Sequence, residues 1–314
     1  MAGAARTRKA KALRRLILKC PDRYSHNIAS PSWVFVLAGH PKLRTFSKDP
    51  EDHFEPAVPR RLEHPFENVP ILDWWRYDYD HVFIVLNPFF RVPGYTPESA
   101  AWSPMRLSVD PSELMDASMP ERENAAPPGF GDLIKQTGSP VSWTRVAQEI
   151  GAFDFHQFAR TVWREVTAQE LDPDETDIAD RLVAHCATSG LYMPEEDVLP
   201  PIYEPNVERY LRALGISNVT LWSEWRDLSR PCPVSSFSRL NPATELPGEK
   251  LSAVSAPGMM MSWAYDDVAG LLALTDEMRE RVDPAEFFEG FWADAATTSV
   301  VFAPEGAPPP LARN

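Results

Sequence analysis

Proline constrains this chain more than any other residue, because it occurs 32 times against 14 glycines. Its frequency is about twice the average of ~5%. The proline ring fixes the backbone angle φ and removes the amide donor, so it interrupts helices and central strands. Here the prolines fall singly or in pairs between apolar segments, with no internal repeat. This spacing predicts short helices and strands joined by stiff, extended connections.

Short apolar runs predict buried strands. Residues 33–39 and 82–87 are bounded by proline or glycine and are rich in β-branched and aromatic side chains. Such side chains favour a pleated, buried setting. Residues 218–223 and 298–303 have the same character and give a third and a fourth candidate strand.

Apolar residues recur at the i, i+3, i+4 spacing of an amphipathic helix in three segments. Each stripe needs a core to pack against, and Gly215 supplies a C-cap for the second helix. Together with the strands, these helices predict an α+β fold: one compact domain, a mixed sheet with packed helices, and long proline-rich loops. The three stripes are Phe155, Phe158, Ala159, Val162 and Val166; Val207, Tyr210, Leu211 and Leu214; and Val268, Leu271, Leu272, Met278 and Val282.

The net charge of −14 is unevenly distributed along the chain. Residues 1–21 carry seven bases and no acid, which leaves 24 bases against 45 acids, a net charge of −21, in the remainder. An apolar stripe in the same segment predicts a helix. We therefore divide the chain into a basic helical arm at 1–24, a single α+β domain at 25–303, and a loose C-terminal tail at 304–314.

This charge distribution limits the partners that the domain can bind. A body so acidic repels nucleic acid and anionic membranes and attracts a basic protein. No apolar run approaches the ~20 residues that cross a bilayer. Three distant cysteines without a CxxC pair predict neither a disulfide framework nor a zinc site, and they fit a reducing cytoplasm.

The acids cluster most densely in residues 165–197, and this cluster is the main candidate for a binding surface. It could be a solvated helix face with capping acids, or a patch that steers and contacts a basic partner. Large aromatic rings beside carboxylates suit such an interface, which adds Trp74 and Trp75. The acidic candidates are Asp172, Asp174, Glu175, Asp177, Asp180, Glu195, Glu196 and Asp197.

The segment Asp73-WWRYDYDH-Val82 is the main candidate for catalysis. Asp78, Asp80 and His81, joined by His40, could hold a metal ion and activate water in a hydrolase. The same residues also suit a solvated strand entry. The usual nucleophile, zinc and phosphate-binding motifs are absent from the sequence, so it predicts no cofactor and no metal site of standard spacing.

Residues 142–166 resemble a helix-turn-helix in outline, with Gly151 between two helical patterns. A recognition helix needs a basic or amide-rich exposed face, whereas the residues that follow are strongly acidic. DNA binding is therefore a weaker alternative, because nearby carboxylates oppose the approach of phosphate.

Two C-terminal stretches, Trp263-AYDDVAGLLAL and Glu289-GFWADAATT, resemble the closing segment of a family of uncharacterised bacterial proteins. Some small acidic members of such families are thought to neutralise toxins. The resemblance implies a cytoplasmic immunity-type protein. Our leading hypothesis is a non-enzymatic, acidic protein-binding module, with a basic toxin or nuclease as the implied partner. A metal-dependent hydrolase and a helix-turn-helix DNA-binding protein are the alternatives.

Overall fold

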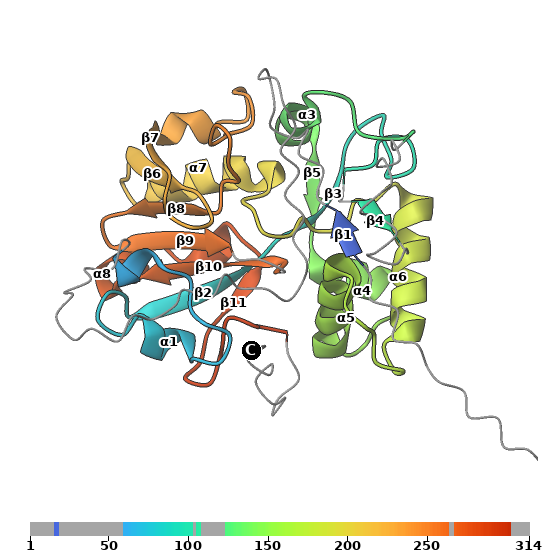
Figure 1. Ribbon diagram of the computed structural model, residues 1–314, viewed down its shortest axis with the longest axis horizontal. Coiled ribbons are helices and arrows are strands. Elements are labelled where there is room, and N and C mark those ends of the chain that lie inside the picture. Colours follow the sequence, from blue (N-terminus) through green and yellow to red (C-terminus); the bar gives the residue numbers. More distant parts are fainter. Residues whose placement is uncertain (1–15, 19–58, 103–104, 108–122, 264–266, 303–314) are drawn as a thin grey trace, which may run out of the picture.

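A seven-stranded sheet forms one half of the structure, which is a computed structural model (Figure 1). The structure describes residues 59–102, 123–263 and 267–302, together with the backbone of residues 16–18 and 105–107. Every pairing within the large sheet is antiparallel. Its strands, in spatial order, are β11 (Gly290–Trp292), β2 (His81–Leu86), β10 (Ala269–Leu274), β9 (Met259–Trp263), β8 (Ala253–Ala256), β6 (Asn218–Trp222) and β7 (Ser229–Pro233).

The central strands are apolar along their whole length because both faces of the sheet are covered. Alternate residues of β2 enter different cores: Val82, Ile84 and Leu86 face one, and Phe83 and Val85 face the other. This is the period-2 alternation that a strand imposes. The first core also contains residues of α1, α4, α5 and α6, and the second contains residues of α7.

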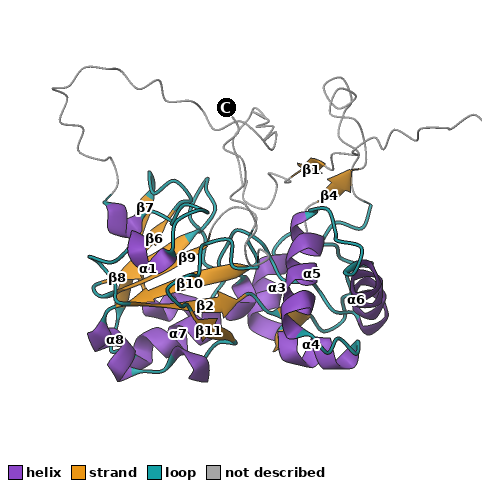
Figure 2. Cartoon of the chain, turned by 90° about the horizontal axis from the view of Figure 1, so that it is seen from below, coloured by secondary structure: helices purple, strands orange, loops and turns teal. Residues whose placement is uncertain are grey.

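The other half of the structure contains α3 (Phe130–Thr137), α4 (Trp143–Glu149), α5 (Phe155–Thr167) and α6 (Thr176–Ser189), which pack at one end of the sheet (Figures 1 and 2). A two-stranded sheet of β3 (Phe89–Arg91) and β5 (Ser139–Val141) continues from the large sheet into this half. Two strands with described backbone, β1 (Leu16–Leu18) and β4 (Met105–Leu107), pair with each other. The other described helices are α1 (Ile71–Trp74), α7 (Glu204–Ala213) and α8 (Asp276–Arg281), with 3-10 turns at Arg60–Leu62, Pro201–Tyr203, Val234–Phe237 and Pro284–Glu286.

Asn87, which directly follows β2, joins the two halves through a buried hydrogen-bond network. Its side chain is fully buried. Its Oδ1 accepts from the indole of Trp263 at 3.0 Å, and its Nδ2 donates to the carbonyl of Glu195 at 2.7 Å. Its own carbonyl accepts from the indole of Trp143 at 2.7 Å. One residue therefore fixes the sheet, α4 and the 194–200 loop relative to one another.

Glu289, at the start of β11, makes a second connection to α4. Its carboxylate accepts from the backbone amides of Trp143 at 2.6 Å and Thr144 at 3.0 Å, and from the Thr144 hydroxyl at 2.8 Å. The amides at the start of a helix lack partners within the helix, and a negative charge there is stabilising. The sheet thus caps the helix that begins the helical half.

A fully buried ion pair connects α3 to α7. Lys135 Nζ lies 2.7 Å from Glu204 Oε2, and neither side chain is more than 1% exposed. The ammonium also donates to the carbonyls of Ser236 at 2.8 Å and Pro242 at 2.7 Å, so its three N–H groups are all used. Glu204 in turn accepts from the amide and hydroxyl of Thr244. Burial raises the pKa of the Glu204 carboxyl, and the Lys135 charge opposes that shift.

The structure confirms the α+β class and several predicted elements, including β2, β6, α5 and α7. Gly215 has the left-handed φ of 77° expected of a helix C-cap. The helix predicted from Val268 to Val282 is wrong. Residues there form β10 followed by α8, because a fully buried strand has the same apolar density as a helix stripe.

Two further predictions differ from the structure. Residues 298–303 were expected to form a strand, but Thr298 makes only an isolated bridge to Pro70. The basic arm was expected to be helical, yet Leu16–Leu18 is strand β1, paired with β4. The strand predicted at 33–39 and the tail at 304–314 lie outside the described residues. Within the described ranges, no helix is long and apolar enough to cross a bilayer.

We expect Asn87→Ala to lower the free energy of unfolding by about 2–4 kcal/mol, because it leaves a buried indole N–H and a buried carbonyl without partners. Urea unfolding of the full chain measures this loss. The matched control is Asn218→Ala, since Asn218 is exposed and donates only to its neighbour Ser217 among the bonds seen. It should change stability by about 0.5 kcal/mol at most. Equal losses in both variants would contradict the role given to Asn87.

We expect Lys135→Met to cost about 3–5 kcal/mol, because it leaves the Glu204 carboxylate buried without its cation. The double variant Lys135→Met, Glu204→Leu should recover much of this loss, since it removes both buried charges together. Urea unfolding of Lys135→Met, Glu204→Leu and the double variant measures these losses. If the double variant lost as much stability as the two single variants together, the pair would not be coupled.

Candidate functional site

The exposed acids of the helical half lie where the turn between α4 and α5 meets the start of α6. Gly151 makes this turn with a left-handed φ of 69°. Asp154 then caps α5 by accepting from the Gln157 amide at 3.1 Å. Gln157 also donates to Asp174 Oδ2 at 2.9 Å, which ties α5 to the segment before α6. We call the following exposed residues the acidic surface: Phe153, Asp154, Glu170, Asp174, Asp177 and Asp180.

Beneath this surface, Glu175 holds α5 and α6 together. Its carboxylate is fully buried and pairs with Arg160 and with Arg164, the latter at 3.0 Å. Its Oε2 also accepts from the Asp172 amide at 3.0 Å. The hydrogen bond from Arg164 lowers the pKa of Asp172, and the hydrogen bond to Glu175 raises the pKa of Arg160. Glu175 is therefore a structural residue, although the sequence placed it in a binding surface.

The arginines near the acidic surface are already engaged. Arg181 pairs with Asp177 at 2.9 Å and also donates to the Ile150 carbonyl. Residues 154–181 hold eight acids against the three arginines at 160, 164 and 181, a net charge of −5. Asp177 nevertheless keeps 82% of its side chain exposed. The surface therefore presents carboxylates to solvent without a compensating free cation among these residues.

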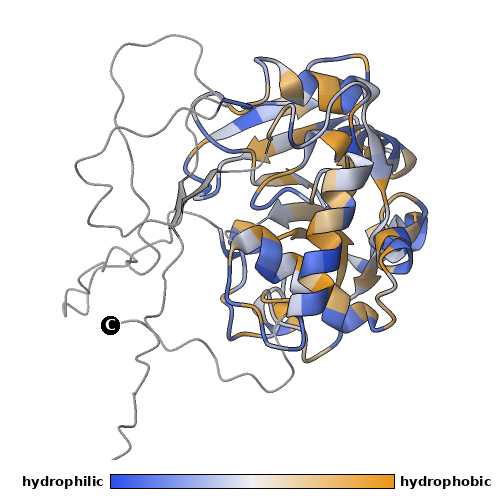
Figure 3. Cartoon of the chain, turned by 90° about the vertical axis from the view of Figure 1, so that its right-hand side faces the viewer, coloured by the Kyte–Doolittle hydropathy of each residue, from blue (hydrophilic) through white to orange (hydrophobic). Residues whose placement is uncertain are grey.

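Phe153 directly precedes Asp154 at the turn between α4 and α5, and its side chain is completely exposed. The neighbouring rings Phe155 and Phe158 instead pack against each other in the core. Among the described residues, Phe153 is the most exposed of several large apolar side chains at the surface, which include Tyr77, Trp225 and Leu240. Figure 3 shows this side of the molecule, where hydrophilic and hydrophobic segments alternate along the helices.

Three predicted acids lie elsewhere, and the prediction that they share one solvated surface needs correction. Glu195, Glu196 and Asp197 are buried, with at most 8% of each residue exposed. They belong to the loop that leads into the second core, and Lys250 pairs with Asp197 at 3.2 Å. The density of acids in the sequence could not reveal this burial, because the residues that cover these three acids are distant in the chain.

The two predicted tryptophans are core residues and not surface contacts. Trp74 is 8% exposed and Trp75 is fully buried. Arg60 lies over the Trp74 ring at 4.3 Å, and Phe66 packs edge-on against the same ring at 4.8 Å. Their apolar rings bury α1 against the sheet, which explains why the sequence places them beside a strand.

Among the described residues, two of the predicted hydrolase residues, Asp80 and His81, both contact Asp276 at the start of α8. Asp80 accepts from the amide of Asp276 at 2.8 Å and so caps α8. His81 Nε2 contacts Asp276 Oδ1 at 2.7 Å, and Arg279 lies 3.0 Å from its Nδ1. Because arginine only donates, Nδ1 accepts and Nε2 carries the proton. Asp78 is half-buried and makes no bond to this group, and His40 lies outside the described residues.

The predicted helix-turn-helix outline is present as α4, the Gly151 turn and α5. Its second helix does not offer a free basic face, however. Arg160 and Arg164 both bind the buried Glu175, and the neighbouring surface is acidic. Phosphate would have to approach against those carboxylates.

A polar cluster that the sequence did not indicate joins His64, Arg226 and Ser262. Ser262 Oγ lies 2.7 Å from Arg226 Nη2 and 3.0 Å from His64 Nδ1. Arg226 donates to the Ser262 hydroxyl oxygen, and His64 Nδ1 shares a hydrogen bond with the same hydroxyl group. Ser262 is fully buried, so it is not an accessible nucleophile. Only the fold brings these residues together, and no local motif marks them.

The cluster holds His64 neutral. The Nε2 atom is shielded from solvent and has no hydrogen-bond partner. Burial, followed by the charge of Arg226, lowers the pKa of His64 to about 3. Across the described ranges, no group of three or more His, Cys, Asp or Glu side chains is placed to hold a metal ion. The hydrogen bonds of the cluster connect the 62–66 loop to the sheet.

A family model described as "Protein of unknown function (DUF2711)" matches residues 67–302, which is more than half of the chain. The match agrees with the uncharacterised family expected from the sequence and extends it over both the sheet and the acidic surface. Searches of curated proteins and of solved structures found no match.

We expect the stability of the protein to fall as the pH is lowered from about 6.5 toward 3, in part because of His64. The folded state keeps His64 neutral, whereas the unfolded chain takes up a proton below its ordinary pKa of 6.5. Between pH 6.5 and 5 this difference amounts to at most about 2 kcal/mol. Urea unfolding at both pH values should give a smaller pH dependence for His64→Gln than for the wild type.

The control for this experiment is His156→Gln, because His156 is exposed on α5. It should keep the wild-type change of stability with pH. If the His64 variant also kept that change in full, His64 would not be held neutral by the fold.

Proposed function

We propose that this chain, which belongs to the DUF2711 family of proteins of unknown function, is an acidic protein-binding module that contacts a basic protein through the acidic surface. An immunity-type inhibitor of a basic toxin or nuclease is the most specific form of this proposal. The observation that carries it is the fully exposed Phe153 among carboxylates whose neighbouring arginines are already paired.

Charge supports this proposal through the kinetics of association. A patch of one sign attracts an oppositely charged partner and raises the encounter rate at low salt. The three arginines close to the surface are oriented toward Glu175 and Asp177, so they do little to weaken its negative field at a distance. Surface carboxylates alone add little affinity, because water screens them.

Phe153 supplies the apolar contact that charge alone does not give. Interfaces draw most of their affinity from a few large side chains that become desolvated on binding, surrounded by polar groups that set orientation. Phe153 stands at a turn fixed on both sides, by the Asp154 cap and by the Arg181 contact to Ile150. The backbone that carries the ring is therefore fixed, so a partner that covers Phe153 has only its side chain to order.

The two alternative functions receive less support from the positions of their residues. For a hydrolase, Asp80 and His81 are occupied at the start of α8. For DNA binding, the α5 arginines are bound internally. Neither alternative explains the exposed ring.

The proposal predicts that the acidic surface, and not net charge, decides binding. A variant with Asp154→Asn, Asp174→Asn, Asp177→Asn and Asp180→Asn should no longer retain the basic proteins that the wild type captures from a native lysate at low salt. High salt should release the same proteins from the wild type, because it shortens the screening length to a few ångströms. At low salt, Phe153→Ala should weaken retention by about 1–3 kcal/mol, because it removes the apolar contact.

The matched control changes the same amount of charge on the other half of the molecule. It carries Glu249→Gln, Glu277→Gln, Glu280→Gln and Glu286→Gln, all at exposed positions of the sheet half. This variant should bind like the wild type. If both four-residue variants lost binding equally, or if the wild type retained no basic protein at low salt, the acidic surface would not be the binding site.

A further inference from the structure

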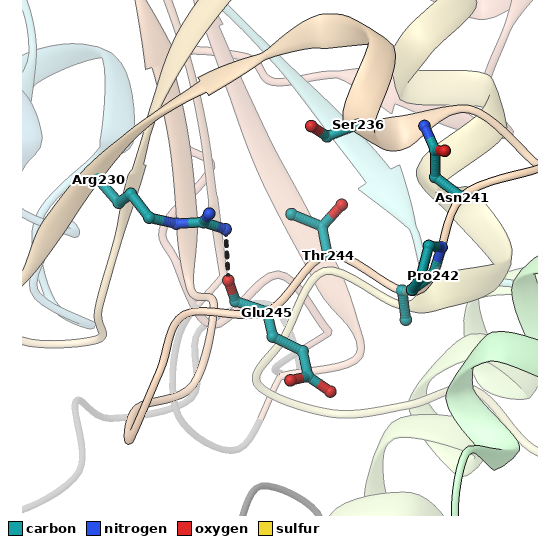
Figure 4. A pocket seen from close by; sticks show the side chains of 7 residues that line it. Arg230, Ser236, Asn241, Pro242, Thr244 and Glu245 are labelled. Atoms are coloured by element: carbon teal, nitrogen blue, oxygen red, sulfur yellow. Dashed lines mark hydrogen bonds between the residues drawn. The ribbon is translucent and has the colours of Figure 1, made fainter.

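A depression of about 320 Å³ lies on the sheet half, between β7 and the loop that follows the 3-10 turn Val234–Phe237. It is separate from the acidic surface, and its lining is polar. Figure 4 shows Arg230, Ser236, Asn241 and Thr244 arranged around the same space. The lining residues are Arg230, Ser236, Asn241, Pro242, Ala243, Thr244 and Glu245.

The walls of this depression are held by the buried ion pair of Lys135 and Glu204. Lys135 donates to the carbonyls of two lining residues, Ser236 and Pro242, and Glu204 accepts from a third, Thr244. A buried ion pair is a costly way to gain stability, since apolar residues of similar volume often do as well. What it does provide is a fixed geometry, which a binding site requires of the residues that support it.

Arg230 gives the depression its positive charge. Its Nη2 donates to the carbonyl of Glu245 at 2.7 Å, the one side-chain hydrogen bond of Arg230 seen among the described residues. The remaining N–H groups of the guanidinium are therefore available to a ligand. The carboxylate of Glu245 is turned away from Ser236 and Asn241 (Figure 4). The planar fork of arginine matches the two oxygens of a carboxylate.

Two other lining groups are hydrogen-bond acceptors, so a ligand that binds them needs a hydrogen-bond donor. Asn241 Nδ2 donates to the Ser235 carbonyl at 2.7 Å, which leaves its Oδ1 as an acceptor. Thr244 donates its hydroxyl proton to Glu204, so its oxygen also remains an acceptor. A ligand with both a carboxylate and a hydroxyl group satisfies Arg230 and these two acceptors.

We propose that this depression binds a small hydroxycarboxylate, with its carboxylate on Arg230 and its hydroxyl donating toward Asn241 and Thr244. The site is independent of the protein-binding proposal, because it uses none of the residues of the acidic surface.

The test is an NMR titration of the ¹⁵N-labelled full chain with sodium L-lactate, with ionic strength held constant by sodium chloride. Saturable shifts should appear at the amides of residues 236, 241 and 243–245. Arg230→Gln should weaken the apparent affinity about tenfold or more, because it removes the charge-assisted bonds. Asn241→Asp should weaken it as well, because it places a negative charge opposite the ligand.

Two controls complete the experiment. Arg212→Gln, on an exposed α7 arginine paired with Glu208, should bind lactate like the wild type. The neutral analogue 1,2-propanediol should give no saturable shifts at these amides. The proposal is overturned if lactate gives no saturable shifts there, if Arg230→Gln binds as tightly as the wild type, or if propanediol binds equally well.

Discussion

The hydrogen bonds of Asn87 are the interaction on which the rest of the structure depends. Asn87 directly follows β2, and three hydrogen bonds of its side chain and carbonyl reach the sheet, α4 and the 194–200 loop. Because all three lie in a dry interior, each unmade bond would leave a buried polar group without a partner. The helical half therefore has one position relative to the sheet, and Glu289 reinforces it by capping α4. These contacts of Asn87 and Glu289 make the acidic surface rigid.

Acidic residues in this protein have two different roles, and the burial of their side chains distinguishes the two groups. Glu175 and Glu204 are buried carboxylates that bind cations and hold segments together. Asp154, Asp174 and Asp177 cap helices or bind neighbours through one oxygen while they remain open to solvent. A count of acids along the chain merges the two groups. Only the second group can meet a partner, and it surrounds Phe153.

The sequence predicted the elements whose pattern is local. The continuous apolar run of β2 and the stripe of α5 are both visible within a short window, and both elements are present. Val268 to Val282 was misassigned because a strand buried on both faces loses its alternation, so its period no longer distinguishes it from a helix. The strands β8 and β9 were missed, although β9 is buried throughout.

The candidate site was predictable only in part, for a physical reason. The acidic character of residues 170–180 follows from their composition, which is visible in the sequence itself. Whether an acid is exposed depends on partners distant in sequence, such as Arg160 for Glu175 or Lys250 for Asp197. The exposure of Phe153 depends on a turn whose outer side nothing covers in the described part of the chain. The same limit hid the cluster of His64, Arg226 and Ser262, which long-range folding alone assembles.

The central claim is that a rigid acidic surface around Phe153 is where this protein meets its partner. Hydrogen–deuterium exchange of the full chain, free and in complex with a captured basic protein, tests that claim most directly. The account predicts that added protection is concentrated in residues 150–181, with the sheet half unchanged. Protection centred on the sheet half, or none at the α4–α5 turn and the start of α6, would contradict it.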